Sequence, residues 1–233
     1  MQIHASDYEH VLLLLDGVRL NDIDAGFPES TGIPVQIIDR IVVVKGPASS
    51  AWGSALGGVI NIVTKKAGNN RRLTGTLYSS YGEGPSMEYR ADAAWSAARF
   101  GHYLYGGYMD SDGLLDDRYF TSKSFYGKTT ADLVGDISLT FAAGYWYPDE
   151  KDYDLPDYDL NYTSDVENYL GTGKMAAGLA PDWRLDLEMY YRGQNWYNHF
   201  TTLSRNWGRP INYRQKPFSG PQRRGGSSGR QQA

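Results

Sequence analysis

A dense run of carboxylates lies between Pro148 and Asp165, in the segment PDEKDYDLPDYDLNYTSD. Carboxylates this close together repel one another unless a cation gathers them, and Ca²⁺ takes about six to eight oxygen ligands from flexible loops of this kind. The spacing is not that of an EF-hand, because neither a Gly at the sixth position nor a Glu at the twelfth is in frame. The segment is therefore interpreted either as a solvated acidic loop or as a calcium site, with the candidate ligands Asp152, Asp154, Asp157 and Asp159.

Other reactive groupings in the sequence are weak. Asp186 and Glu188 could serve as a pair for glycoside hydrolysis, but residues i and i+2 share one face of a strand and suit a wet polar surface equally well. The glycines of Gly46–Gly58 lack the Gly-Lys-Ser/Thr of a phosphate-binding loop and are explained by turns and close packing. The histidines are scattered without metal-ligand spacing: His4, His10, His102 and His199. We expect no enzymatic activity.

Composition narrows the class of protein further. The chain of 233 residues has a net charge of −4, which argues against general nucleic-acid binding. It contains no cysteine, so disulfides and thiolate metal sites are excluded. No apolar run approaches the length of about 18 residues that a membrane helix needs. The early run Val11–Leu15 is short and has no basic region ahead of it, so we expect no signal peptide here.

The first part of the chain predicts a small α+β unit. Val11–Leu15 is expected to be a buried strand that enters a tight turn at Asp16-Gly17, with Val18–Leu20 as a possible return strand. Two further β-branched runs are expected to be buried strands, and two short pieces to be helical, the first with Pro34 at its first position. The strands are Ile41–Lys45 and Gly58–Lys65, and the helical pieces Val35–Arg40 and Ala48–Trp52.

From Arg72 onward, segments of about ten residues alternate apolar and polar side chains. In Trp183–Arg192 the odd positions are all apolar and the even positions mostly charged, which suits a strand with one wet face. Short turns alternate with longer loops along the chain, and this favours an outer-membrane β-barrel over a soluble β-sandwich. The predicted strands are 73–82, 88–98, 102–111, 124–134, 137–147, 166–179 and 183–197.

Two stretches of the first part, LLLLDGVRLND and IDRIVVVKGPASSAWGSALGGVINIVTKK, resemble the plug domain of TonB-dependent outer-membrane receptors. The family pattern is DGV-x-LN, then I-x-RIEV-x-RGP-x-S-x-x-YG, then GGVINIITK before the barrel. This sequence departs from it mildly, with Asp39 and Val43 where Glu is usual, Lys45 for Arg and Trp52 for Tyr. The resemblance covers roughly residues 11–67.

The resemblance implies an α+β plug remnant followed by antiparallel transmembrane β-barrel strands of an incomplete large barrel. Its function would be the uptake of a scarce nutrient, such as a ferric siderophore or cobalamin, across the bacterial outer membrane. The partners would be the TonB energy-transducing complex, the nutrient itself and outer-membrane lipid, with no nucleic acid and no cofactor apart from the possible calcium. The alternative is a small outer-membrane barrel or adhesin-like binding protein without active transport.

The resemblance also implies roles for individual residues. Arg40 and Lys45 occupy positions where the family uses basic side chains to pair with barrel carboxylates, although they could equally be solvated strand-end charges. The loop after DGV-x-LN faces the ligand in the family, and an ordinary polar loop is the competing interpretation. It supplies the candidate substrate contacts Asn21, Asp22, Asp24, Phe27, Glu29, Ser30 and Thr31.

The expected domains are the C-terminal part of a plug at residues 1–67, the first barrel strands at 68–214, and a disordered or out-of-frame tail at 215–233. About seven strands are predicted, where the family closes a barrel of about 22. We therefore expect a fragment that does not insert or transport on its own.

Overall fold

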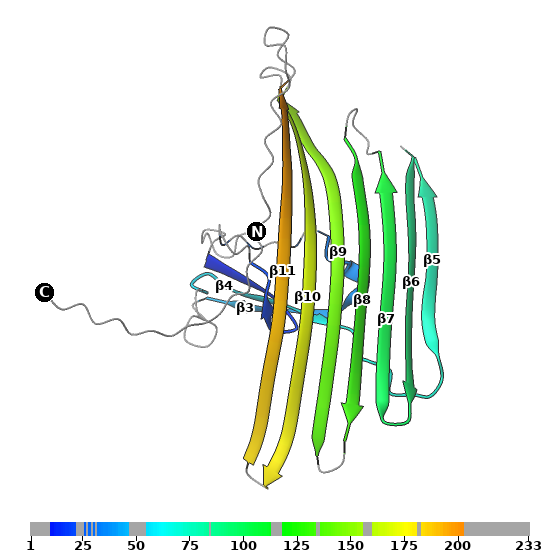
Figure 1. Cartoon of the computed structure of the whole chain (residues 1–233), viewed down its shortest axis with the longest axis vertical. Coiled ribbons are helices and arrows are strands. Elements are labelled where there is room, and N and C mark those ends of the chain that lie inside the picture. The colour runs from blue at the N-terminus through cyan, green and yellow to red at the C-terminus, as the bar shows by residue number, and fades with distance from the viewer. Residues whose placement is uncertain are drawn as a thin grey trace, which may run out of the picture.

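The structure is a computed structural model, and it describes residues 10–21, 26, 28, 30, 32–46, 55–83, 85–112, 118–133, 136–155, 160–180 and 183–202. Within the strands, the side chains of residues 152–155, 160–162, 164, 180 and 198–202 lie outside this description. Two sheets make up the described part. A small four-stranded sheet with the order β2-β1-β4-β3 crosses a large sheet of seven long strands at about mid-height (Figure 1).

The small sheet is built around two apolar strands. β1 (Val11–Leu15) runs parallel to β4 (Gly58–Thr64), with Val11 opposite Gly58, and all five β1 residues are buried. A strand covered on both faces requires an unbroken apolar run, and this explains the sequence VLLLL. The predicted turn follows β1: Asp16 and Gly17 take φ angles of 49° and 91°, as a two-residue hairpin turn requires, and β2 (Val18–Arg19) returns antiparallel.

The segment before Gly46 differs from the prediction in two ways. The helical piece is only a 3-10 turn, η2 (Val35–Ile37), preceded by Pro34 at φ −65°, and β3 (Ile38–Lys45) begins three residues earlier than expected. The prediction that Ile41–Val44 is buried was wrong: these side chains are 41–54% exposed, so both faces of β3 are open, and in the described part β3 is an edge strand paired with β4. The predicted helical turn at Ala48–Trp52 lies outside the described residues.

The large sheet confirms all seven predicted strands, and neighbours in sequence are neighbours in the sheet. Its strands are β5 (Thr74–Gly82), β6 (Ser86–Ala97), β7 (Phe100–Ser111), β8 (Phe120–Asp132), β9 (Ile137–Leu155), β10 (Leu160–Ala180) and β11 (Trp183–Thr202). Every pair is antiparallel. In the part that the structure describes, β5 and β11 form the two edges, so the sheet is an unclosed section of a barrel.

The expectation of a loop over the whole of Pro148–Asp165 was wrong. β9 continues to Leu155 and β10 begins at Leu160, so most of this segment is an extended hairpin in which Asp149 lies opposite Asp165. In this segment the alternation of apolar and polar side chains stops although the strands remain paired. The sequence pattern alone therefore did not predict the extension of these two strands. The ends of β6, β8 and β10 and the beginnings of β7, β9 and β11 do lie at one end of the sheet, at the bottom of Figure 1, as the short predicted turns require.

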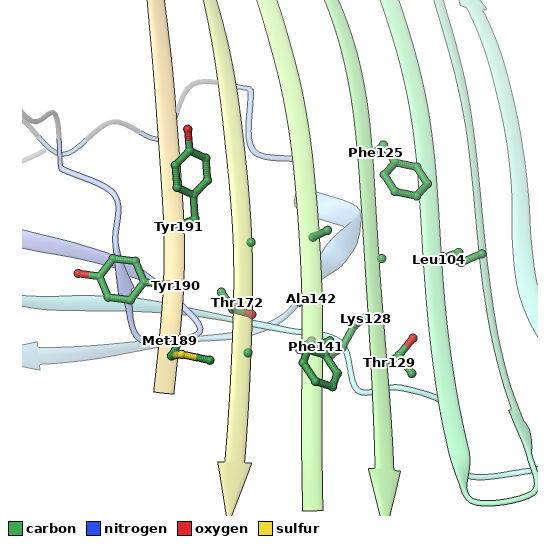
Figure 2. Close-up of a pocket in the computed structure, with 14 residues that line it drawn as sticks. Leu104, Phe125, Lys128, Thr129, Phe141, Ala142, Thr172, Met189, Tyr190 and Tyr191 are labelled. Atoms are coloured by element: carbon green, nitrogen blue, oxygen red, sulfur yellow. The ribbon is translucent and has the colours of Figure 1, made fainter. Parts of the chain in front are cut away.

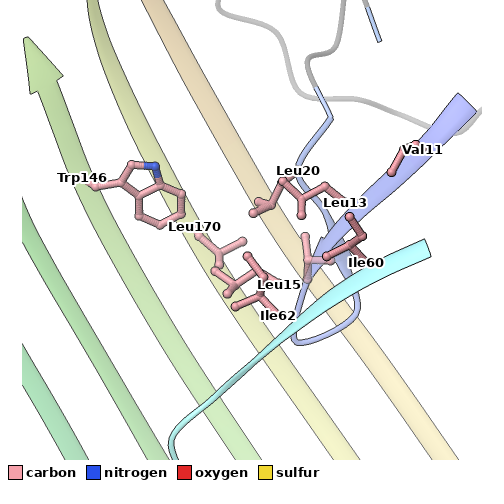
Figure 3. Packing of buried hydrophobic residues seen from close by; sticks show 9 residues of the cluster. Val11, Leu13, Leu15, Leu20, Ile60, Ile62, Trp146 and Leu170 are labelled. Carbon is pink, nitrogen blue, oxygen red and sulfur yellow. The ribbon is translucent and has the colours of Figure 1, made fainter. Parts of the chain in front are cut away.

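The main hydrophobic cluster lies between the two sheets. Leu13, Leu15 and Leu20 pack against Ile60 and Ile62, and this group lies on Trp146 of β9 and Leu170 of β10 (Figure 3). The face of the large sheet that meets the small sheet is called the inner face, and the opposite one the outer face. Among the described residues no helix is long and apolar enough to cross a membrane.

The connection between the sheets follows the inner face closely. The amide of Gly68 donates to the carbonyl of His102, and a Cβ at Gly68 would lie 2.5–2.6 Å from the backbone of Trp95. Only glycine fits such a close approach of two backbones.

Candidate functional site

The Asp16-Gly17 turn projects from the small sheet onto the inner face of the large sheet. Asp16 Oδ2 accepts from Lys128 Nζ of β8 at 2.9 Å and from the Thr64 hydroxyl at 2.6 Å, while Oδ1 accepts from the Thr64 amide at 2.8 Å. The Tyr126 hydroxyl lies 3.3 Å from Oδ2 and 2.9 Å from the Thr64 hydroxyl. Asp16 and Lys128 are 17% and 11% exposed, so this ion pair is largely withdrawn from water.

Opposing effects act on the carboxyl of Asp16. Burial by itself would raise its pKa, but the charge of Lys128 and the hydrogen bonds from Thr64 and Lys128 together outweigh burial and lower the pKa below its ordinary value of 3.8. The carboxylate therefore stays charged in the docked turn, where it is bound by groups from both sheets.

A second cation holds the backbone of the same turn. Lys174 Nζ of β10 donates to the carbonyl oxygen of Asp16 and forms an ion pair with Glu188 of β11 at 2.9 Å. A Cβ at Gly17 would lie 3.7 Å from Lys174 Nζ, so the turn sits directly against this pair. Three strands of the large sheet, β8, β10 and β11, thus contribute charged groups around one turn.

Asn21 connects the start of the next loop to both sheets. Its side chain accepts from the Leu13 amide at 2.9 Å and donates to the carbonyls of Val11 at 2.8 Å and Gly26 at 2.9 Å. Its own carbonyl accepts from Arg192 of β11, which also donates to Gln194 at 3.1 Å. Asn21 is therefore a buried clamp that fixes the loop to β1.

A third group of contacts lies around η2. The Tyr105 hydroxyl donates to the Gln36 side-chain oxygen at 3.2 Å, and the Gln36 amide lies 3.4 Å from Glu88 of β6. Ile37 is fully buried against Tyr103 and Tyr126. This contact is mostly apolar, in contrast to the charged contact at Asp16.

Of the predicted site residues that the structure describes, Asn21 lies at these contacts, whereas Arg40 and Lys45 do not. Arg40 pairs at 2.8 Å with its neighbour Asp39 on the exposed strand β3, and its side chain is 58% exposed; Lys45 is exposed at the end of the same strand. Their role as anchors stays a prediction. In the loop predicted to contact substrate, Asn21 is buried and Ser30 is exposed, and the other candidates lie outside the described residues: Asp22, Asp24, Phe27, Glu29 and Thr31.

The candidate calcium ligands stay untested. Asp152 and Asp154 lie on β9, but their side chains are outside the described part, as are Asp157 and Asp159 altogether. Among the residues that the structure does describe, no three His, Asp or Glu side chains come together as a metal site would require.

The outer face has a different character. On β8 the side chains of Tyr126 and Lys128 point inward, so Phe125 points outward and Gly127 occupies an outward position. The same alternation turns Phe141 of β9 and Met189 and Tyr191 of β11 outward. Phe125, Phe141, Met189, Tyr191 and Leu104 line a groove of about 730 Å³ (Figure 2). Gly127, Gly171 and Gly173 also line it. The outer face around this groove is therefore apolar, whereas the charged groups that contact the small sheet lie on the inner face.

Comparisons with known proteins agree with this arrangement. Residues 2–59 match the family model described as the TonB-dependent receptor plug domain. The structure resembles the alcaligin outer-membrane receptor FauA of Bordetella pertussis (TM-score 0.63, 20% identity, 80% of this chain and 31% of that one). It also resembles the ferripyoverdine receptor of Pseudomonas aeruginosa (0.56, 15%, 91% and 41%) and the ferric enterobactin receptor PfeA of the same organism (0.53, 18%, 86% and 40%).

At these identities the solved structures show a common fold, and this chain spans less than half of the length of each of them. Strands β1, β2 and β3 of the small sheet lie in the region that the family model matches, β4 begins at its end, and the large sheet follows. The first part of the chain therefore matches the plug domain of TonB-dependent receptors, and the seven-stranded sheet that follows shares the fold of the similar outer-membrane receptors.

Proposed function

We propose that the chain serves in the TonB-dependent uptake of a ferric siderophore across the bacterial outer membrane. The plug-domain match supports the class of receptor, and the similar solved structures are receptors for alcaligin, ferripyoverdine and ferric enterobactin. Cobalamin, the other nutrient expected from the sequence, has no such support among them. The work of the molecule is binding and gated passage, with no bond of the ligand made or broken.

The observation that carries the proposal is how the plug is attached to the wall. Its charged contact at Asp16 and Lys128 and its polar contact at Asn21 and Arg192 are made to side chains that water could solvate once the plug moves. Such contacts hold the plug in place and still permit release under force from an energy-transducing partner such as TonB. A permanently fused core would be apolar throughout.

The outer face supports a membrane location. Along β11 the outward residues Trp183, Leu187, Met189 and Tyr191 are 51–75% exposed, and this apolar stretch has the length of a membrane-crossing strand, about 9–11 residues. On the neighbouring strand β10, opposite Gly193 and so beyond this apolar stretch, the Tyr169 hydroxyl donates to Glu167 at 2.9 Å. At this level the outer face changes from apolar to polar. We place the hydrocarbon layer below this tyrosine.

An adhesin-like barrel without transport is the competing class. It has no need of a plug, and here the small sheet, most of which lies in the region matched as a plug domain, packs on the large sheet through a hydrophobic cluster and a buried ion pair. We therefore favour the transport receptor.

Titration of the chain in detergent micelles with ferric alcaligin, ferripyoverdine and ferric enterobactin tests the proposal. We expect saturable quenching of tryptophan fluorescence by one of these chelates. The iron-free siderophores and cyanocobalamin serve as matched controls and should bind more weakly. Equal responses to all ligands, or no response to any ferric chelate, would argue against a siderophore receptor.

A further inference from the structure

The groove on the outer face follows one cross-strand row. Reading from β7 to β11, this central row is Leu104–Gly127–Ala143–Gly171–Tyr191. Its three inner positions are small, whereas its two ends carry large side chains. Because neighbouring strands lie about 4.8 Å apart, the row is about 19 Å long. The groove therefore has its long axis across the strands and small residues along its centre.

Large side chains lie on both sides of the central row (Figure 2). Phe125 is two positions away along β8 on one side, and the next outward row on the other side contains Phe141 and Met189. The ring of Phe141 lies close to the neighbouring strand, since a Cβ added at Gly173 would lie 3.6 Å from it. The groove is thus bounded along its length as well as at its ends.

The open centre of the groove depends on glycine. A Cβ added at Gly127 would lie 3.2 Å from Leu104, so this position is already covered by a side chain. A Cβ added at Gly171 would meet no atom within 4 Å. Gly171 therefore marks the part of the groove that is free to take an occupant.

The lining suits an uncharged, apolar occupant. Of the fourteen residues that line the groove, Lys128 alone is charged, and its ammonium lies on the inner face, bound to Asp16. The Thr129 hydroxyl lies 3.1 Å from the His102 ring. β8, β9 and β10 are paired with a strand on each side, so their backbone donors and acceptors serve the sheet. A charged ligand would lose its water here and gain little in return.

The groove is continuous with the surface that we assign to the membrane. Met189 and Tyr191 belong both to its lining and to the apolar stretch of β11. Gly171 lies two positions beyond Tyr169 on β10, just within the proposed hydrocarbon layer. In this layer, water in the groove would find few partners, and an empty groove would lose dispersion contacts. A hydrocarbon chain from the membrane is the occupant that avoids both costs.

We propose that the groove is a binding site for an acyl chain of a membrane lipid, which it holds more firmly than the lipid around the rest of the outer face. A long, flexible and uncharged chain matches the elongated shape and the apolar lining. Its methylene groups cover the central row and pack between Phe125 and Phe141. The inference rests on the membrane location in the proposed function.

Photolabelling of the full chain in micelles of an uncharged detergent tests the site. The probe is a phosphatidylcholine with a diazirine midway along one acyl chain, and mass spectrometry locates its adducts. We expect the adducts to concentrate on Phe125, Phe141 and Met189, with several-fold fewer on Trp183, which is 72% exposed on the same face. Adducts distributed in proportion to exposure would mean that lipid contacts this face without a site, and would overturn the proposal.

A side chain in the centre of the groove should remove the site. Each buried methylene contributes about fourfold to binding, so Gly171→Leu, which displaces two or more, should reduce the adducts in the groove roughly tenfold. Gly106→Leu is the matched control, because Gly106 is also an outward glycine whose added Cβ would meet no atom within 4 Å, but it does not line the groove. Its adducts should change by less than about twofold. An equal loss in both variants would contradict the assignment.

A second pair of variants keeps the test decisive if Gly171→Leu does not fold. Phe141→Ala removes one side of the groove and should lower the adducts on Met189 about three- to tenfold. Phe100→Ala removes an outward ring of similar exposure that does not line the groove, 47% against 56%, and should leave these adducts unchanged. Adducts on Met189 that are insensitive to Phe141→Ala would overturn the proposal.

A second copy of the chain is the competing occupant. Sedimentation in micelles would then show a dimer that Gly171→Leu dissociates and Gly106→Leu does not, and this result would overturn the lipid assignment. Photolabelling needs no siderophore, so the two proposals fail separately. Adducts confined to the groove of a chain that binds no ferric siderophore would contradict the proposed function alone. Evenly spread adducts on a chain that binds one would contradict the lipid site alone.

Discussion

The carboxylate of Asp16 lies 2.9 Å from the ammonium of Lys128, across the boundary between the plug and the barrel wall. The two residues are 112 positions apart, and one belongs to a turn while the other belongs to a strand. Because the pair is largely buried and also binds Thr64 and Tyr126, it fixes the position of the turn on the wall. The attachment of the plug is therefore sensitive to this one carboxylate.

Replacement of Asp16 by Asn should loosen the plug. Loss of one partner leaves Lys128 without its counter-charge, which costs about 3–5 kcal/mol in a fully buried pair and about 2–3 kcal/mol here because both side chains are partly exposed. Val18→Cys provides the reporter, since Val18 is buried in the cluster that meets the wall and the chain has no other cysteine. Its maleimide labelling should become roughly 30- to 150-fold faster.

Asp39→Asn is the matched control for this measurement. Asp39 also pairs with a cation at 2.8 Å, but that pair is exposed on β3, and exposed pairs contribute little. Labelling of Val18→Cys should change by less than about threefold in this variant. An equal response to both substitutions would mean that general charge, and not the buried pair, attaches the plug.

Acid should remove the contribution of Asp16. Its pKa is lower in the docked turn than in the detached or unfolded chain, so its stabilisation is complete above the ordinary value of 3.8 and is lost as the pH falls below that value toward the lowered pKa. Urea unfolding followed by tryptophan fluorescence should show a constant gap between the unmodified chain and Asp16→Asn from pH 7 to pH 5. The gap should narrow at pH 3; a gap that widens in acid would contradict the assignment.

The hydrophobic contact between the plug and the barrel wall should depend on Trp146. This side chain is 5% exposed and packs on Leu13, Leu20 and their neighbours, so Trp146→Ala should cost about 3–5 kcal/mol of plug attachment. Trp183→Ala, at a position 72% exposed on the outer face, removes the same ring without touching the plug. Labelling at Val18→Cys should accelerate in the first variant and stay unchanged in the second.

The strands of both sheets follow from local pattern, but their contacts with each other do not. The alternation in Trp183–Arg192 predicts which side chains face inward, and Glu188 and Arg192 do so. Nothing near Lys128 in the sequence indicates that its partner is Asp16. The aspartate itself gave no signal of a distant partner, since an Asp-Gly pair is already accounted for by the tight turn that it forms. The residues of the site were therefore missed although the elements that carry them were predicted.

β3 shows a different error of prediction, in which the local sequence pattern indicated burial that the structure does not have. Its run of valines predicts burial, yet burial depends on what lies beside a strand, and β3 is an edge. One signal was available: Val43 stands where the resembling family uses Glu, a residue that seldom lies in a core.

The two neighbouring strands β3 and β4 should consequently respond differently to the same substitution. Val43 is 47% exposed, so Val43→Lys should change the free energy of unfolding by less than about 0.5 kcal/mol. Val59 is 1% exposed and packs with Leu12 and Leu14, so Val59→Lys buries an unpaired ammonium and should cost more than about 4 kcal/mol. Urea unfolding of the two variants measures both values. A large cost at Val43 as well would show that another surface covers β3 in solution, since the small sheet itself leaves that side chain in contact with water.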